Sequence, residues 1–242
     1  MNLFLYGFSN SGKTTIFNLI SKKHHQPTLS YTLEMEPAQG TSFIIDERVY
    51  SIKNIFPQRE AKFTPVQITD YMGILKDTKH NTQVLNMAQK ADILIYIIRN
   101  FSNQEVPSPV DEINPMKEFK LLQQEALLKD LQIIETRLNS IKDMEKKGKK
   151  GDSKEKEFLE KFKEFIENGE GKLNLKEGKK KFPHLSFLSW LPFCVLINSD
   201  EKGVEGDFVE FLEKESIPYF KVLGKVEEEA MELGGEGIEW LI

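Results

Sequence analysis

Residues 7–14 read Gly-Phe-Ser-Asn-Ser-Gly-Lys-Thr and fit the pattern G-x-x-x-x-G-K-[ST]. A short apolar stretch, residues 2–6, precedes this motif, and a helix is predicted at residues 14–21 after it. In such a strand–turn–helix setting the glycines let the backbone curl until successive N–H groups point at phosphate oxygens, and the helix adds the positive end of its dipole. Lys13 is then expected to contact the β- and γ-phosphates, and the Thr14 hydroxyl to ligate Mg²⁺. The stretch predicts a binding site for a nucleoside polyphosphate.

Most of the remaining chain alternates between short apolar strands and helices. Further strands are predicted at residues 41–45, 65–69, 93–98, 192–197 and 219–223, and further helices at 82–89, 206–214 and 226–233. The unbroken apolar run at 93–98 is typical of a parallel strand that is buried on both faces. The alternation predicts an α/β domain with a mostly parallel sheet.

A central segment, residues 107–181, differs in composition. It carries 18 Lys and Arg and 16 Asp and Glu, so 34 of its 75 residues are charged, against 37 of the other 167. Pro107 and Pro109 mark its front edge, and Gly178 and Pro183 mark its back edge. We therefore expect an inserted module of a different kind.

The insert is predicted to form two helices. The first, at residues 115–144, has a 4, 3, 4, 3 spacing of apolar residues: Leu127, Leu131, Ile134, Leu138 and Ile141. Asp152 or Ser153 can cap the second, in which Phe158, Phe162 and Phe165 repeat the spacing. Together they would make an antiparallel hairpin, which could be a structural strut or an arm that binds a partner. The hairpin at 107–181 would divide the nucleotide domain into residues 1–106 and 182–242.

Composition excludes several classes of protein. A mean hydropathy of -0.42 and a longest clean apolar run of six residues leave no membrane-spanning segment, which would need about 20 apolar residues. The N-terminus does not resemble a signal peptide. One cysteine and four histidines exclude a disulfide scaffold and disfavour a zinc site. We expect a cytoplasmic protein with no membrane partner and no DNA partner.

Two further motifs stand at predicted strand ends. Residues 70–73, Asp-Tyr-Met-Gly, fit D-x-x-G, in which the aspartate holds Mg²⁺ and the glycine N–H contacts the γ-phosphate. Residues 200–203 match the pattern too. Only Asp70 stands at the end of a predicted strand at the expected distance from Lys13. Residues 198–201, Asn-Ser-Asp-Glu, follow a predicted strand at the place where guanine-binding proteins carry Asn-Lys-x-Asp. Residues 174–177 also fit Asn-x-x-Glu, but only Asn198 stands at the carboxyl end of a strand, where ligands bind in open α/β sheets. Ile74 stands where many such proteins have a glutamine that orients the attacking water.

These motifs and the position of the insert resemble the YchF-type branch of the Obg-related P-loop NTPases, over nearly the whole chain. Five further stretches carry the resemblance: Asn10 within residues 7–15, Glu36-Pro37 with Gly40 and residues 46–49, Arg99-x-Phe101 with residues 113–115, residues 185–188, and residues 225–227. The Asn-x-x-Glu variant and the insert position are specific to this branch.

The resemblance implies a G-protein-like P-loop domain interrupted by the hairpin, and a weak NTPase that accepts ATP in preference to GTP. Expected catalytic residues are Lys13, Asp70 and Gly73, and expected ligands of Mg²⁺ are Thr14 and Asp70. Expected nucleotide-binding residues are Asn10, Ser11, Gly12, Lys13, Thr14, Thr15, Asn198, Glu201 and Gly224. Asn10 could also help to coordinate K⁺ at the phosphates.

The chain departs from the family in four places. Glu34 replaces a switch threonine, with Thr32 nearby; no glycine occurs between Gly73 and Gly148; and Ser108 replaces a histidine. The sequence ends at Ile242, where the family continues into a TGS domain associated with RNA and ribosome contact. The first three departures predict slow hydrolysis, and the fourth weakens the case for a ribosome or RNA partner.

Two other functions stay open from the sequence. The chain could be a nucleotide-sensing interaction protein that hardly hydrolyses its ligand and works through the hairpin. A small-molecule kinase is the weaker alternative, because no arginine-rich lid is present. Lysines at 146–150 and 179–181 could contact an RNA backbone, but acidic residues interleave with them and the insert has a net charge of only +2.

Overall fold

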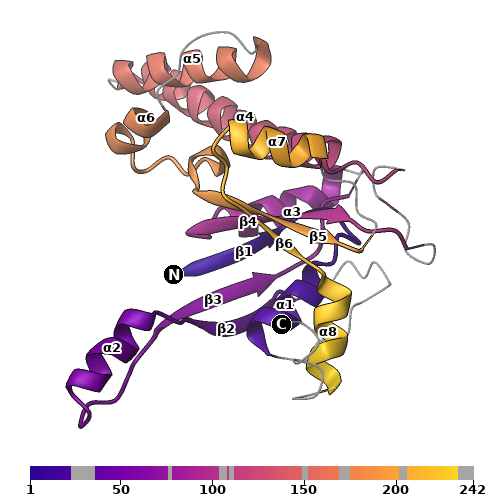
Figure 1. Ribbon diagram of the computed structural model, residues 1–242. Coiled ribbons are helices and arrows are strands. Elements are labelled where there is room, and N and C mark those ends of the chain that lie inside the picture. The colour runs from indigo at the N-terminus through magenta and orange to yellow at the C-terminus, as the bar shows by residue number, and fades with distance from the viewer. Residues whose placement is uncertain are drawn as a thin grey trace.

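The computed structural model describes residues 1–22, 36–75, 78–103, 108, 112–148, 152–168, 175–201 and 206–233. Within them, six strands form one sheet in the order β2-β3-β1-β4-β5-β6 (Figure 1). The strands are β1 Asn2–Tyr6, β2 Ala38–Ile44, β3 Thr64–Asp70, β4 Ile93–Asn100, β5 Phe193–Ser199 and β6 Tyr219–Val222. Only β2, at one edge, runs antiparallel to its neighbour. The mostly parallel α/β sheet is thus confirmed, and the carboxyl ends of β1, β3, β4, β5 and β6 meet at one edge.

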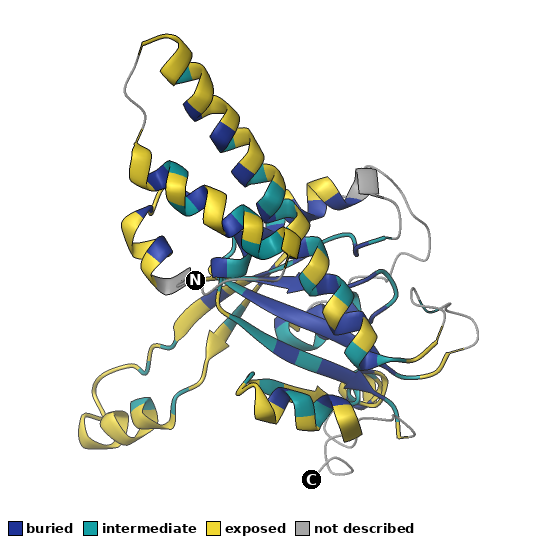
Figure 2. Ribbon diagram, turned by 90° about the horizontal axis from the view of Figure 1, so that it is seen from above, coloured by how far each residue is buried: buried dark blue, intermediate teal, exposed yellow. Residues whose placement is uncertain are grey.

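Helices cover both faces of the sheet. Alternate strand residues face opposite ways, so Leu5 and Ile97 pack with α1 (Lys13–Ser21), beside which α8 (Gly224–Leu233) lies. Tyr6 and Ile98 pack on the other face. The helices there are α3 Thr78–Ala88, α4 Pro115–Lys146 and α7 Gly206–Lys214. The central strands β1, β4 and β5 are largely buried, whereas the edge strands β2 and β6 are more exposed; Figure 2 shows dark blue strands at the centre of the molecule.

The predicted helical hairpin is confirmed. Helix α4 leads into α5 (Ser153–Asn168), and the two run antiparallel, because later residues of α5 pair with earlier residues of α4. Lys163 Nζ lies 2.7 Å from Glu135 Oε1, and Lys156 Nζ lies 3.1 Å from Glu145 Oε2. Asp152, one of the two expected caps, accepts hydrogen bonds from the first N–H groups of α5. Charged contacts along the hairpin therefore fix its register.

The buried line along α4 differs from the predicted one. Leu127 and Leu131 are only half-buried, and Ala126 and Asp130 occupy the buried positions instead. The prediction assumed that a partner helix covers α4 throughout. In the structure the N-terminal half of α4 packs against β4 and the short 3₁₀ helix η1 (Leu188–Trp190). The C-terminal half of α4 packs against α5. Two partners in different directions displace the buried line.

Two helices escaped prediction. Gly178, which we expected to break the chain, lies inside α6 (Leu175–Lys181), where a Cβ would come within 2.5 Å of the Phe158 ring. Close packing explains that glycine. Helix α2 (Glu47–Ile55), capped by Asp46, extends from the sheet between β2 and β3 and has no buried residue (Figures 1 and 2). Val49, Ile52 and Phe56 stand at helical spacing, but none of them is buried.

A second core joins the hairpin to the segment that returns to the sheet. Leu159 and Phe162 of α5 and Ile134 of α4 pack with Phe187 and Trp190. Asp130 of α4 accepts hydrogen bonds from the backbone N–H groups of Leu188 (2.7 Å) and Ser189 (3.0 Å). The chain that leads into β5 is thus held by the hairpin, and the domain boundaries at 107 and 181 stay a prediction. No helix in the described ranges is long and apolar enough to cross a membrane.

Candidate nucleotide-binding site

The loop between β1 and α1 has the curled backbone that its glycines predict. Asn10 has φ 65° and Gly12 has φ 87°, both left-handed. A Cβ on Gly12 would also overlap the Asn198 side-chain amide, so both backbone and space require glycine there. Gly12 caps α1 without any side-chain hydrogen bond. The first N–H groups of α1, at Lys13, Thr14 and Thr15, therefore keep their capacity for an anion.

Lys13 lies buried under this loop. It is 6% exposed, and its Nζ donates to the Phe8 carbonyl oxygen over 2.8 Å. Burial lowers the pKa of the Lys13 ammonium, while the charges of Asp70 and Glu118 act in the opposite direction. A buried ammonium with a single strong acceptor is poised for an anionic ligand that would restore its charge balance.

Thr14 and Asp70 come together from different elements. Thr14 Oγ1, on the first turn of α1, donates to Asp70 Oδ2 over 2.8 Å, and Asp70 is 7% exposed at the end of β3. Nearby in the loop, the Ser11 hydroxyl is fully buried and finds no hydrogen-bond partner among the described residues. The Thr14 hydroxyl and the Asp70 carboxylate offer oxygen ligands of the kind that Mg²⁺ prefers, and the Ser11 hydroxyl can donate a hydrogen bond to a phosphate oxygen.

The loop after Asp70 is bonded directly to the phosphate-loop backbone. Ile74 N donates to Gly7 O over 2.9 Å, and Ser9 N donates to Ile74 O over 3.0 Å. A Cβ on Gly73 would overlap the backbone of Phe8 and Ser9, so this glycine is required by close approach. The Ile74 side chain is fully buried in the core and does not face the site. That position 74 offers no group to orient the attacking water agrees with this burial and stays a prediction.

Asn81 holds the same loop from the other side, and sequence reasoning missed it. Its side-chain amide accepts from Leu75 N and donates to Leu75 O, both over 2.9 Å. Asn81 Nδ2 also donates to Glu125 Oε2 of α4 over 3.1 Å. The only sequence signal was an asparagine directly before the helix predicted at residues 82–89. Nothing in the local sequence shows that its side chain bonds to the Leu75 backbone, six residues earlier.

Arg99 and Glu118 form a second unpredicted link. Arg99 was noted only for the resemblance; its Nη1 donates to the Asn10 carbonyl oxygen over 3.2 Å, and its guanidinium lies 4.4 Å from the centre of the Phe101 ring. Glu118 Oε1 of α4 accepts from Arg99 N over 3.2 Å. Burial raises the pKa of Glu118 to about 8, against the opposing effects of Arg99 and Lys13. Glu118 lies off the buried line predicted for this helix, so the sequence held no signal for its burial.

Asn198 links the phosphate loop to the other side of the site. Its Nδ2 donates to Ser11 O over 3.1 Å, and its Oδ1 accepts from Gly224 N over 3.2 Å. Gly224 must stay close, because a Cβ there would lie 2.6 Å from Asn198 Oδ1. These contacts use two of the four hydrogen bonds that an amide can make.

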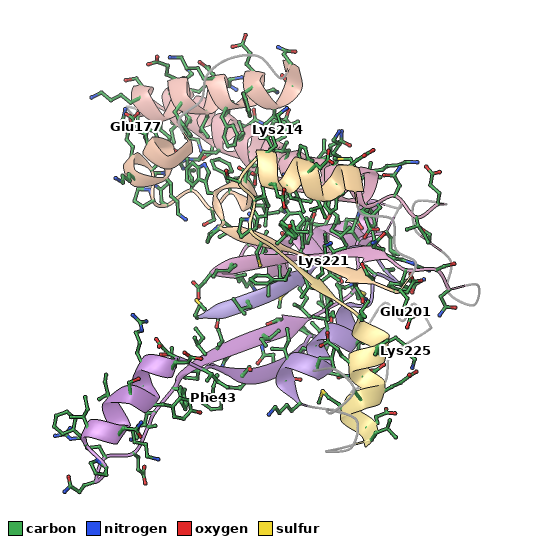
Figure 3. All side chains as sticks on the ribbon, viewed as in Figure 1. Phe43, Glu177, Glu201, Lys214, Lys221 and Lys225 are labelled. Atoms are coloured by element: carbon green, nitrogen blue, oxygen red, sulfur yellow. The ribbon has the colours of Figure 1, made fainter. Side chains whose placement is uncertain are left out.

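The neighbours of Asn198 differ in exposure. Ser199 is buried, and its hydroxyl accepts from Asn100 Nδ2 over 3.0 Å, so it does not project toward a ligand as the lysine of a guanine-binding motif would. Asp200 Oδ2 accepts from Ser102 N over 2.8 Å. Glu201 is exposed beyond the end of β5, near the first turn of α8 (Figure 3).

The structure thus brings most of the expected site residues to one edge of the sheet. Residues 10–15, Asp70, Gly73, Asn198 and Gly224 are connected by the contacts above, while Glu201 lies at the rim. Thr32 and Glu34 lie outside the described residues. Ser108 donates to Glu112 O over 3.2 Å.

Comparison with known proteins gives consistent results. A family model described as 50S ribosome-binding GTPase matches residues 2–137. The chain is 21% identical over 253 residues to the ribosome-binding ATPase YchF of Mycoplasma pneumoniae, covering 98% of this chain and 70% of that protein. It is 25% identical over 245 residues to the YchF of Escherichia coli O157:H7, covering 96% and 67%.

The fold has a solved counterpart. The structure of the Schizosaccharomyces pombe YchF GTPase superposes with a TM-score of 0.75 at 17% identity, over 99% of this chain and 70% of that one. At this identity the likeness concerns the fold alone. The family model, however, matches more than half of the 242 residues. The chain therefore belongs to the 50S ribosome-binding GTPase family of P-loop NTPases, as a member of the YchF/Obg-like ATPases.

Proposed function

We propose that this chain binds a nucleoside triphosphate with Mg²⁺, hydrolyses it slowly, and acts as a nucleotide-controlled switch. The observation that carries the proposal is the 2.8 Å hydrogen bond between Thr14 Oγ1 and Asp70 Oδ2, directly beside the buried Lys13. It supports a site in which hydroxyl, carboxylate and ammonium groups from two motifs act on one ligand.

In this proposal the phosphates occupy the curled loop. The backbone N–H groups of residues 11–15 donate to phosphate oxygens, and the α1 dipole favours their negative charge. Lys13 exchanges its bond to the Phe8 carbonyl for the β- and γ-phosphates. Gly73 N–H donates to the γ-phosphate, which makes the loop after Asp70 sensitive to a triphosphate.

Thr14 and Asp70 fit Mg²⁺ through their oxygen atoms, with Asp70 acting through a water molecule. When bound, the ion would neutralise charge on the phosphate oxygens. Asn10, in its left-handed conformation, is the residue we assign to K⁺. Its backbone carbonyl is engaged by Arg99, so the side-chain amide would supply the oxygen.

Asn198, Glu201 and Gly224 form the base side of the proposed site. Glu201 is longer by one methylene than the aspartate of guanine-binding motifs, and its carboxylate would crowd the 2-amino group of guanine. Adenine lacks that group. We therefore propose a modest preference for ATP over GTP, since both bases find some partners.

The ribosome is the partner we propose for the switch. Support comes from the family description and from the names of the YchF relatives. Co-sedimentation with 50S subunits in the presence of each nucleotide tests this. The alternative, an interaction protein that binds nucleotide without turning it over, is separated by single-turnover hydrolysis with Mg²⁺ and K⁺.

Calorimetric titration of the Lys13→Ala variant with a non-hydrolysable ATP analogue tests the nucleotide site. Loss of a charge-assisted contact worth about 1.5–3 kcal/mol should weaken binding roughly 10-fold to 150-fold. Lys53→Ala, which removes an exposed lysine of α2, is the matched control and should bind normally. Equal affinities for wild type and Lys13→Ala would refute the site.

A further inference from the structure

The first helix of the hairpin reaches two loops of the nucleotide site. Glu118 bonds to Arg99 N (3.2 Å), and Arg99 in turn holds Asn10 in the phosphate loop. Glu125, two turns further along α4, bonds to Asn81 Nδ2 (3.1 Å), and Asn81 holds Leu75. Each carboxylate therefore controls a different loop through one intermediary.

The loop at residues 73–75 is held from both sides. On one side, the Ile74 backbone exchanges hydrogen bonds with Gly7 and Ser9. On the other side, the buried Asn81 amide satisfies both backbone groups of Leu75. The two bonds to Leu75 fix the orientation of the Asn81 amide, and Glu125 accepts from its second amide hydrogen. Because Asn81 is buried, losing that acceptor costs free energy that displacing the amide from Leu75 would relieve.

The Glu118–Arg99 link and the Glu125–Asn81 link should affect the binding of different phosphate groups. The phosphate loop, to which Arg99 and Glu118 are tied, surrounds phosphates that a diphosphate and a triphosphate share. In the proposed function the 73–75 loop contacts the γ-phosphate through Gly73, and a diphosphate lacks that group. A disturbance transmitted through Asn81 should therefore change triphosphate affinity without changing diphosphate affinity.

We propose that Asn81 and Glu125 are positioning residues for the triphosphate-sensing loop, so that the helical hairpin takes part in distinguishing a nucleoside triphosphate from a diphosphate. This inference rests on the proposed function, in which Gly73 N–H contacts the γ-phosphate. By thermodynamic linkage, whatever binds the hairpin and shifts α4 changes the preference between the two nucleotides.

The test compares Glu125→Ala, Glu125→Gln and wild type, each titrated with ADP and with a non-hydrolysable ATP analogue in Mg²⁺. One hydrogen bond of about 1 kcal/mol corresponds to about a five-fold change. Glu125→Ala should weaken the ATP analogue about five-fold and leave ADP within two-fold. Glu125→Gln keeps an acceptor oxygen and should restore the wild-type ratio. Glu135→Ala, further along α4 and paired with Lys163, is the control and should change neither affinity.

A second variant acts on the other partner. Asn81→Asp keeps the acceptor for Leu75 N but removes the donor to Leu75 O and faces Glu125 with a like charge. It should reproduce the selective loss of the ATP analogue. Equal weakening of both nucleotides, or no weakening, in Glu125→Ala overturns the inference while leaving the proposed function intact. A wild-type protein that binds neither nucleotide removes the proposed function, and the inference with it.

Discussion

The Ile74 side chain is fully buried in the core that α3 and α4 share with the sheet. The backbone of the same residue faces the phosphate loop through two hydrogen bonds. A residue can therefore stand at a catalytic position in the sequence without presenting its side chain there. Slow hydrolysis in this chain would follow from the loop geometry as well as from the residue type.

Ile74→Gln separates these two explanations. Because position 74 is fully buried, the new amide would lie in the core and should destabilise the protein by about 1–3 kcal/mol. We expect a lower melting temperature and no increase in single-turnover hydrolysis. A faster enzyme would mean that the side chain can reach the attacking water.

The proposed preference for ATP depends on single residues. Glu201→Asp shortens the carboxylate by one methylene and should raise GTP affinity several-fold relative to ATP. The accompanying lysine of guanine-binding motifs cannot simply be added, because Ser199 is buried against Asn100. Competition titrations check the ratio, with Glu210→Asp on α7 as the control. Tighter binding of GTP than ATP by the wild type would contradict the base-side assignment.

At the scale of elements, α4 carries a buried carboxyl group whose ionisation is linked to folding. The folded pKa of Glu118 is about 8, against an ordinary value of 4.5. Between these pH values the folded chain holds a proton that the unfolded chain has released. The contribution of Glu118 to stability is therefore largest below pH 4.5 and falls as the pH rises toward 8.

Glu118→Gln should remove this dependence, because glutamine keeps the acceptor for Arg99 N but does not ionise. We expect the free energy of unfolding of the wild type, measured in urea from pH 5 to 9, to fall more steeply than that of the variant. One unit of pKa difference is worth about 1.4 kcal/mol. The control, Glu135→Gln at an exposed position on the same helix, should show the pH dependence of the wild type. If the curve of Glu118→Gln runs parallel to that of the wild type, the Glu118 carboxyl is already ionised in the folded protein.

Local patterns predicted most elements and the phosphate loop, since residues 7–14 and the apolar strands are contiguous signals. The contacts that complete the site are not local. Glu125 lies 44 residues from Asn81, and Glu118 lies 19 residues from Arg99. Helix α2 was not predicted although Val49, Ile52 and Phe56 stand at helical spacing. The buried line of α4 was misplaced because two partners cover it from different directions.

For the whole molecule, we predict slow unassisted turnover. Ile74, Glu34 and Ser108 stand at the three sequence positions where a polar activator could stand. Purified protein with Mg²⁺ and K⁺ should hydrolyse ATP below roughly 1 s⁻¹, the low end for typical enzymes. A phosphate-release assay at saturating ATP checks this, and a rate well above that value would show an activating group that the motifs do not contain.

Helix α4 belongs to the connection that leads from β4 to β5, and this limits where the chain can gain or lose residues. These strands are parallel neighbours, so the chain must cross over one face of the sheet to pass from one to the next. Helix α4 makes that crossover, and the Tyr6 hydroxyl donates to its Leu122 carbonyl on the way (3.0 Å). Mutation and insertion can lengthen or shorten the exposed end of the hairpin freely. The base of the hairpin contacts the sheet and the nucleotide site, so it cannot be lost without disturbing them. Related chains should therefore differ in the length of the hairpin and not in its presence.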